Sequence, residues 1–128
     1  MLIIGDALIP FTPIYTINSI DQIKHTSANS VVCFKFDKTI MRYCLDNSVN
    51  YCVKVESLLQ TAIANNLRAR YIIVDRSIAK QVQMVAENYM YDCKILVEIS
   101  DENQIEPYLL DGIDGVIYSH LLVSLQDN

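Results

Sequence analysis

Short apolar runs alternate with amphipathic stretches along most of the chain. The runs are rich in Val, Ile, Tyr, Phe and Cys, the residues that favour β-strands. They span Pro13–Ile17, Val31–Phe36, Tyr51–Val55, Tyr71–Val74, Cys93–Ile99 and Gly115–Tyr118. Tyr71–Val74 is apolar without interruption, which is typical of a strand covered on both faces in a parallel sheet. We therefore expect strands at these places.

The segments between the runs carry helix signals. A Ser or Asp three residues before a Gln, the spacing of a capping box, predicts helix starts at Ser19, Ser57 and Asp101. Apolar residues at helical spacing run from Ser77 to Tyr91, and a shorter helix is expected over Asp37–Leu45. Strand and helix alternate throughout, which predicts an α/β fold with a mainly parallel sheet.

The size and composition indicate a single domain. The chain has 128 residues, of which 52% are apolar and 20% charged, and these are globular proportions. We predict one three-layer α/β domain over residues 1–128, with five or six mainly parallel strands and helices packed on them. Its architecture is expected to be either flavodoxin-like or Rossmann-like, or that of a partial barrel-like sheet.

The charge distribution bears on the partners. The formal net charge is −5, with ten Lys and Arg residues and no basic run longer than Arg68-Ala69-Arg70. Because binding to a nucleic-acid backbone needs a broad basic surface, nucleic acid is not an expected partner. No apolar run is long enough to span a bilayer, so no membrane partner is expected either.

The four cysteines predict a reducing environment. They stand at positions 33, 44, 52 and 93, without a CxxC pair and without a neighbouring His that could complete a zinc site. We expect buried, reduced thiols and a cytoplasmic location. The apolar start, Met1–Asp6, lacks a basic region, so no signal peptide is expected there.

The expected units repeat with a short period. Asp37, Glu56 and Asp75, at the ends of three successive predicted strands, are each nineteen positions apart. From Tyr51 to His120 the alternation of helix and strand is similar in rhythm to phosphate-handling barrel enzymes, including the small class I aldolases. The segments with this rhythm are 62–74, 80–99 and 113–117.

That resemblance concerns geometry and implies no catalytic residue. Where such an aldolase would carry its Schiff-base lysine, this sequence has Tyr118-Ser119-His120. Independently of it, ligands of open α/β sheets bind at the carboxyl ends of the strands, so we expect a ligand site there.

The predicted strand ends offer a candidate site. Asp37, Glu56 and Asp75 could converge on a divalent cation such as Mg²⁺, which prefers oxygen ligands. Arg76 could bind a phosphate or carboxylate, with Ser100 as a further ligand contact. The alternative is that Asp and Ser at these junctions only cap helices. Asp75 is not expected to be needed as a cap, because Ser77 could cap that helix instead.

Three further residues are candidates for acid–base or nucleophilic chemistry. Lys35 and Lys54 occupy matching positions inside apolar runs, and each could act as a nucleophile or base. Glu98, in another apolar run, is a plausible ion-pair partner for one of them. The alternative for the lysines is an edge strand, or side chains that extend to solvent. His120 could transfer a proton near neutral pH. Asp75 is a further candidate for a catalytic residue.

Two functions remain open from the sequence. The chain has three glycines and lacks the GxxxxGK[ST], GxGxxG, GxSxG and HExxH motifs. The first hypothesis is a binding or regulatory domain that acts through a protein partner or self-association, using the apolar ends Leu2–Ile4 and Leu121–Leu125. The alternative is a small metal-assisted enzyme that binds a phosphorylated or otherwise anionic ligand. The sequence does not decide whether the protein is an enzyme.

Overall fold

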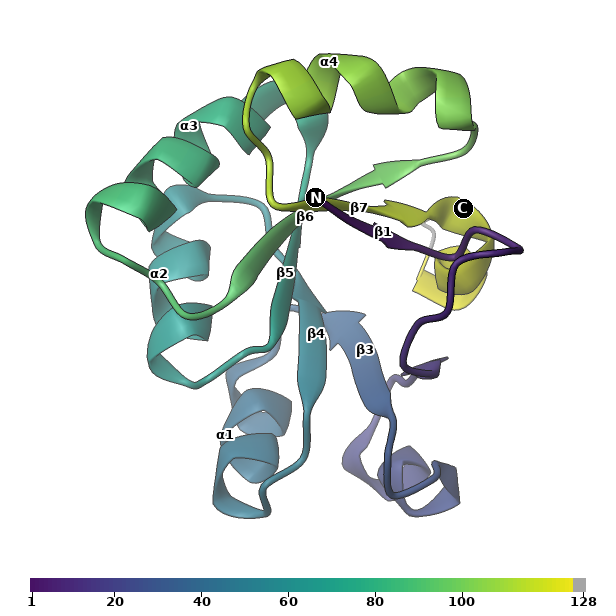
Figure 1. Ribbon diagram of the computed structural model, residues 1–128. Helices are drawn as coiled ribbons and strands as arrows, with labels where there is room; N and C mark the ends of the chain where they lie inside the picture. Colours follow the sequence, from purple (N-terminus) through teal and green to yellow (C-terminus); the bar gives the residue numbers. More distant parts are fainter. Residues whose placement is uncertain (126–128) are drawn as a thin grey trace.

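The computed structural model describes residues 1–125, and these form one curled sheet with helices packed on it (Figure 1). All seven strands of the sheet are parallel, in the order β1-β7-β6-β5-β4-β3-β2. The strands are β1 (Leu2–Ile4), β2 (Ile14–Thr16), β3 (Val31–Lys35), β4 (Tyr51–Lys54), β5 (Tyr71–Val74), β6 (Lys94–Ile99) and β7 (Gly115–Tyr118). The predicted α/β class with a parallel sheet is confirmed, but the sheet has seven strands rather than five or six.

Within residues 1–125, four α-helices and two 3₁₀ segments lie between the strands, and a third 3₁₀ segment follows β7. The α-helices are α1 (Lys38–Asp46), α2 (Leu58–Asn66), α3 (Arg76–Asn88) and α4 (Ile105–Leu110), and the 3₁₀ segments are η1 (Ile20–His25), η2 (Glu102–Gln104) and η3 (Ser119–Leu125). The predicted capping box at Asp101 forms with Gln104, and Ser57 caps α2 by accepting from Gln60 N–H. Ser19 makes no side-chain cap, and the segment after it is only a 3₁₀ helix. No helix within residues 1–125 combines the length and the apolar character needed to cross a membrane.

The chain winds around the sheet in one direction. Strands β2 to β7 are neighbours in sequence order, and β1 pairs with the far side of β7. This is the winding of a parallel barrel, whereas a doubly wound sheet reverses its strand order at a switch point. Of the two predicted architectures, the partial barrel-like sheet is therefore the one that the strand order supports.

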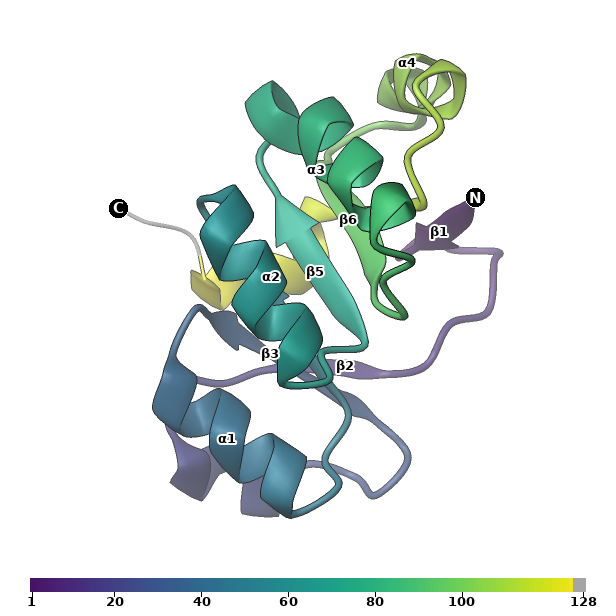
Figure 2. The same cartoon turned by 90° about the vertical axis from the view of Figure 1, so that its left-hand side faces the viewer.

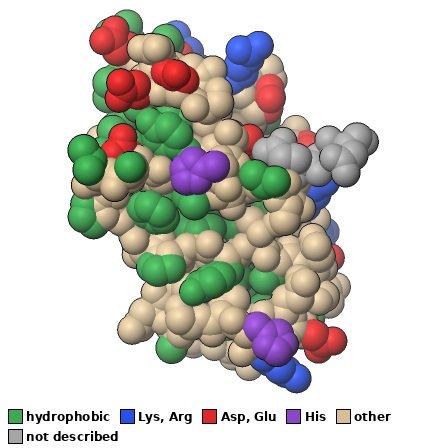
Figure 3. Space-filling model, turned by 90° about the vertical axis from the view of Figure 1, so that its right-hand side faces the viewer, with side chains coloured by type: hydrophobic (Ala, Val, Ile, Leu, Met, Phe, Trp, Pro, Cys, Tyr) green, Lys and Arg blue, Asp and Glu red, His purple; other side chains and the backbone are tan. Residues whose placement is uncertain are grey.

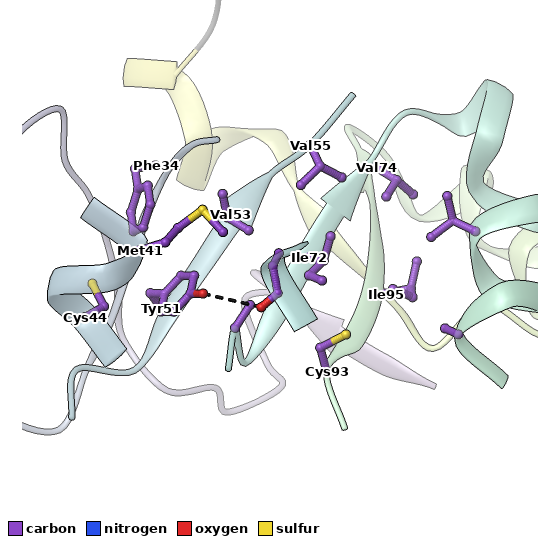
Figure 4. Packing of buried hydrophobic residues seen from close by; sticks show 14 of the residues in the cluster. Phe34, Met41, Cys44, Tyr51, Val53, Val55, Ile72, Val74, Cys93 and Ile95 are labelled. Carbon is purple, nitrogen blue, oxygen red and sulfur yellow. Dashed lines mark hydrogen bonds between the residues drawn. The ribbon is translucent and has the colours of Figure 1, made fainter. Parts of the chain in front are cut away.

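The outer face of the sheet carries the helices. Phe34, Tyr51, Val53 and Ile72 point from the strands into a buried cluster with helix residues such as Met41 (Figure 4). The α-helices lie together on this side (Figure 2). The Tyr51 ring stacks on Phe34 with 5.4 Å between centroids, and its hydroxyl donates to Leu67 O at 2.8 Å. A buried polar group is thereby paired, as a packed core requires.

The inner face is covered by the C-terminal segment η3. Leu122 and Leu125 are buried against the inward side chains of the strands, which include Cys33, Cys52 and Ile73. No α-helix contributes to this cluster. The apolar run Leu121–Leu125, predicted to cover a partner, thus covers the chain's own sheet.

The apolar N-terminal run Leu2–Ile4 is also used within the chain. It forms β1, where Leu2, Ile3 and Ile4 pair with Gly115, Val116 and Ile117. No strand was expected there, because three apolar residues carry little periodicity. The two apolar ends therefore do not support the hypothesis of self-association.

All four cysteines are free and buried, as predicted. Cys33 and Cys52 are register neighbours on the inner face, whereas Cys44 and Cys93 pack on the outer face. Burial raises the pKa of Cys44 to about 11 and that of Cys93 to about 12. Because thiolates are the reactive form, burial lowers the reactivity of Cys44 and Cys93.

One stability prediction follows from the end of α3. Met90 has φ 51°, a left-handed conformation that disfavours side chains, and it is 85% exposed. We expect Met90→Gly to raise the free energy of unfolding by about 0.5–1 kcal/mol in urea denaturation, since glycine relieves this strain. Met84→Gly, the same change inside α3, should lower it by about 1 kcal/mol. A loss of stability in both variants would contradict this explanation.

Candidate functional site

A cavity of about 990 Å³ opens at the carboxyl ends of β4 to β7. Its lining comes from the ends of these strands, from the start of α3, and from η3. The polar residues in this lining include Lys54, Glu56, Asp75, Arg76, Glu98, Ser100 and His120. This is the edge at which ligands bind in parallel α/β sheets. Most of the predicted site residues therefore lie around one cavity.

Lys54 and Glu98 are the inward-facing charged residues of this cavity. Lys54 ends β4 with the same alternation as the inner residue Cys52, and Glu98 follows the inner residue Leu96 in β6. Lys54 Nζ lies 3.8 Å from Glu98 Oε1, with 37% and 24% of the two side chains exposed. The predicted ion pair is thus present, at the mouth of the curled sheet. Lys54 lies on an interior strand, so the edge-strand interpretation of this lysine is wrong.

Asp75 caps α3, contrary to the expectation that Ser77 would do so. Its carboxylate accepts from Ser77 N–H at 2.9 Å and also from the Ser77 hydroxyl. These two hydrogen bonds hold the pKa of Asp75 below its ordinary value. Asp75 is therefore a fixed carboxylate at the rim, and its cap partly offsets the positive end of the α3 dipole.

His120 connects the C-terminal segment to the first loop. Its Nε2 lies 2.9 Å from Gly5 O, and because a carbonyl oxygen only accepts, Nε2 is the protonated nitrogen. The ring also lies 5.9 Å from that of Tyr118. The other ring nitrogen, Nδ1, is thus an acceptor in the neutral imidazole, in a residue that lines the cavity.

Two predicted site residues lie outside this cavity lining. Asp37 caps α1, accepting from Thr39 N–H at 2.9 Å and Ile40 N–H at 3.1 Å. Lys35 is the register neighbour of Lys54 on β3 and is exposed. Neither is among the residues that line the cavity. For Asp37, the capping interpretation accounts for the side chain.

The three strand-end carboxylates do not assemble into a metal centre. Within residues 1–125, no group of three or more His, Cys, Asp or Glu side chains is placed to hold a metal ion. Asp37 and Asp75 are turned toward their own helices by the capping hydrogen bonds, while Glu56 remains exposed. The predicted Mg²⁺ site at Asp37, Glu56 and Asp75 therefore lacks its geometry.

Some lining residues had no predicted role. Gln104 accepts from Ser100 N–H at 2.7 Å, which fixes the loop after β6 beside the cavity. Val123 reaches the cavity from η3, although the apolar run Leu121–Leu125 was expected to cover a partner. The capping-box spacing indicated Gln104, but no sequence signal placed Val123 near the strand ends.

The cavity combines cations, carboxylates and one imidazole. Lys54 and Arg76 supply positive charge, and Arg76 can hold a phosphate or carboxylate through two parallel hydrogen bonds. Glu56, Asp75 and Glu98 supply acceptors for hydroxyl or amine groups. This set of groups suits a small molecule that carries an anionic group and several hydrogen-bond donors.

Comparison with known proteins gives no family: no family model matches the chain, and the search of curated proteins finds no similar protein. The interpretation of the cavity therefore depends on its own residues.

The cap at Asp75 yields a prediction. Asp75→Ala should lower the free energy of unfolding by about 1 kcal/mol, whereas Asp75→Asn should change it by a few tenths, because Asn also caps helices. Since the folded-state pKa is lowered, this contribution is present above the ordinary value of 3.8 and is lost as the pH falls below it. Urea denaturation at pH 7 and pH 3 measures both effects. Equal losses for Asn and Ala would contradict the capping role.

Proposed function

We propose that the protein is a small-molecule-binding domain whose ligand, an anionic metabolite, occupies the cavity at the carboxyl edge of the sheet. The observation that carries this proposal is the Lys54–Glu98 pair, which lies partly buried inside that cavity. Its two members come from β4 and β6, which are separated by β5, and they meet across the inner face of the sheet.

The pair is suited to exchange its internal contact for a ligand. The 3.8 Å separation of Lys54 Nζ and Glu98 Oε1 is longer than a charge-assisted hydrogen bond. Partly exposed ion pairs of this kind contribute about 0–1 kcal/mol, so an incoming anion can recruit Lys54 at low cost. Glu98, which also lines the cavity, can accept a hydrogen bond from the same ligand.

Arg76 and His120 complete the proposed site from the rim. Arg76 begins α3 and is exposed, which leaves its donors accessible to an anion that enters the cavity. His120 supplies an acceptor nitrogen, which is the group that general-base catalysis would need. The proposed role is binding, and a reaction at this site would use His120 for proton transfer.

A cytoplasmic location belongs to the same proposal. Its support is the set of four buried thiols, which are free in the structure. Free thiols of this kind persist in reducing compartments.

The ligand proposal is tested by calorimetry and thermal shift with inorganic phosphate, glycerol phosphate and citrate at constant ionic strength. A ligand at one hundred times its Kd should stabilise the fold by about 2.7 kcal/mol. Lys54→Met should weaken binding at least tenfold (a loss of about 1.4 kcal/mol), because the inward cation is lost.

Lys80→Met is the matched control for that variant. Lys80 also forms an ion pair, 3.8 Å from Asp111, but it lies outside the cavity lining and its side chain is 79% exposed. Binding that is equal in the two variants would contradict the proposal. A response that requires Mg²⁺ would contradict anion binding by side chains alone.

A second candidate function, interaction with a protein partner or a second copy, is favoured by one surface. Exposed apolar side chains gather on the side where residues 6–13 cross toward β2 (Figure 3). Leu8 is 92% exposed, with Ile9, Phe11 and Tyr15 at about 40%. Contiguous exposed apolar residues often mark interaction sites.

Self-association would be visible in the solution mass. If this surface mediates it, light scattering should give a mass above that of one chain that rises with concentration. Leu8→Ser should reduce the associated fraction, whereas Leu59→Ser, at a 70% exposed position on α2, should not. A monomer at all concentrations would exclude self-association and leave the ligand proposal untouched.

A further inference from the structure

A second cavity, of about 700 Å³, lies at the opposite edge of the sheet, where β5 and β6 begin. Its cationic residues are Arg68 and Arg70, in the loop before β5, and Lys94, the first residue of β6. The strands between the two edges have four to six residues, which places this cavity roughly 13–20 Å from the carboxyl-edge cavity. The two cavities are therefore separate sites.

The charge of this cavity differs from that of the whole chain. Three of the ten Lys and Arg residues line it, and Asp92 is the single acidic residue in its lining. The chain as a whole has a net charge of −5. None of the ion pairs found among the described residues involves Arg68, Arg70 or Lys94. Within residues 1–125, the lining of this cavity therefore carries a net positive charge, from three cations and one carboxylate.

The backbone beneath these cations is fixed by hydrogen bonds. Arg70 N–H donates to Tyr51 O at 2.9 Å, and Lys94 N–H donates to Arg70 O at 3.1 Å. The Arg70 guanidinium lies 5.2 Å from the centroid of the Tyr71 ring, a cation–π contact that restrains the side chain. The backbone positions of Arg70 and Lys94 are therefore fixed next to each other, and the Arg70 side chain is restrained as well, which lowers the entropic cost of binding.

The fold itself does not require a cation at the end of α2. Arg68 has φ 66° at the turn after this helix, and Ser48 and Met90, after α1 and α3, adopt the same conformation with φ 54° and 51°. A cation at a helix C-terminus complements the helix dipole. However, the other two helices end without one, so stability of the helix end is not a sufficient reason for Arg68.

We propose that Arg68, Arg70 and Lys94 form a binding site for a small, multiply charged phosphate compound at the amino edge of the sheet. Two guanidinium groups can each form paired hydrogen bonds to phosphate oxygens, and the lysine adds a third charge. Asp92 accepts hydrogen bonds from hydroxyl or amine groups of the same ligand. Three cations match the charge of a diphosphate better than that of a single carboxylate.

The site is tested by titrating pyrophosphate into the ¹⁵N-labelled full chain at constant ionic strength. The amide signals of Arg68, Arg70 and Lys94 should shift with a saturable dependence. The Arg68→Gln/Arg70→Gln double variant should raise the Kd at least tenfold, and both positions are exposed, so the fold should persist. Arg42→Gln, at an exposed position on α1 outside this cavity, is the control and should leave the Kd unchanged.

Each other outcome would overturn the proposal. Shifts confined to Lys54, Arg76 and His120 would assign pyrophosphate to the carboxyl edge alone. Equal weakening by Arg42→Gln would show a general ionic effect. Binding to a single-stranded RNA oligomer or to phosphatidylserine vesicles, without binding to pyrophosphate, would replace the ligand class. Failure at the amino edge leaves the carboxyl-edge proposal untouched, because the two are read from different amide signals.

Discussion

The burial of the inner face by η3 is the interaction on which the rest of the structure depends. Seven parallel strands curl without closing, so their inward side chains need a cover that the α-helices, all on the outer face, do not provide. Leu122 and Leu125 fill this role, and full burial of such a side chain contributes about 1.5–3 kcal/mol. Segment η3 packs against β2, β3 and β7, and the Ser124 hydroxyl donates to that of Thr16 in β2. The same segment brings His120 and Val123 to the carboxyl edge. Segment η3 therefore both covers the inner core and forms part of the cavity wall.

Strand alternation decides which polar residues at that edge belong to the site. Lys54 and Glu98 occupy positions that share the inner face with Cys52 and Leu96, and they therefore point into the mouth of the sheet. The residues just beyond the strands have a different role, which is to accept hydrogen bonds from the unpaired N–H groups at the start of the following helix. Asp75 has that role for α3, as Asp37 does for α1. Polar residues at this edge thus have two roles: Lys54 and Glu98 face the cavity, whereas Asp37 and Asp75 cap helices, Asp75 at the cavity rim.

The sequence predicted what depends on local patterns and missed much of what depends on long-range contacts. The strand at Tyr71–Val74 was predicted with the bounds it has, because a continuous apolar run is a local pattern. The ion pair of Glu98 with a lysine is a long-range contact, and it was predictable because a charge inside an apolar run needs a partner. Strand β1 was missed because its three apolar residues form a strand only by pairing with β7, more than one hundred positions away. Asp75 was misassigned because Asp and Ser at neighbouring positions cap equally well, and backbone geometry makes the choice. Asp37, Glu56 and Asp75 are not grouped around one point within residues 1–125 for a related reason, since proximity of strand ends does not fix side-chain direction.

The scarcity of glycine constrains how this protein can recognise anions. With three glycines, the chain cannot build the glycine-rich loops whose backbone N–H groups usually surround a phosphate. Gly115 is already required by packing, because a Cβ there would lie 2.8 Å from Leu2 Cβ. After α1, α2 and α3, where glycine is the usual residue, the left-handed positions carry Ser48, Arg68 and Met90, whereas α4 is followed by Gly112. An anion bound in either of the proposed sites would therefore depend mainly on cationic side chains. Both cavities supply them in the same manner, on residues next to strand ends whose backbone the parallel sheet holds in place.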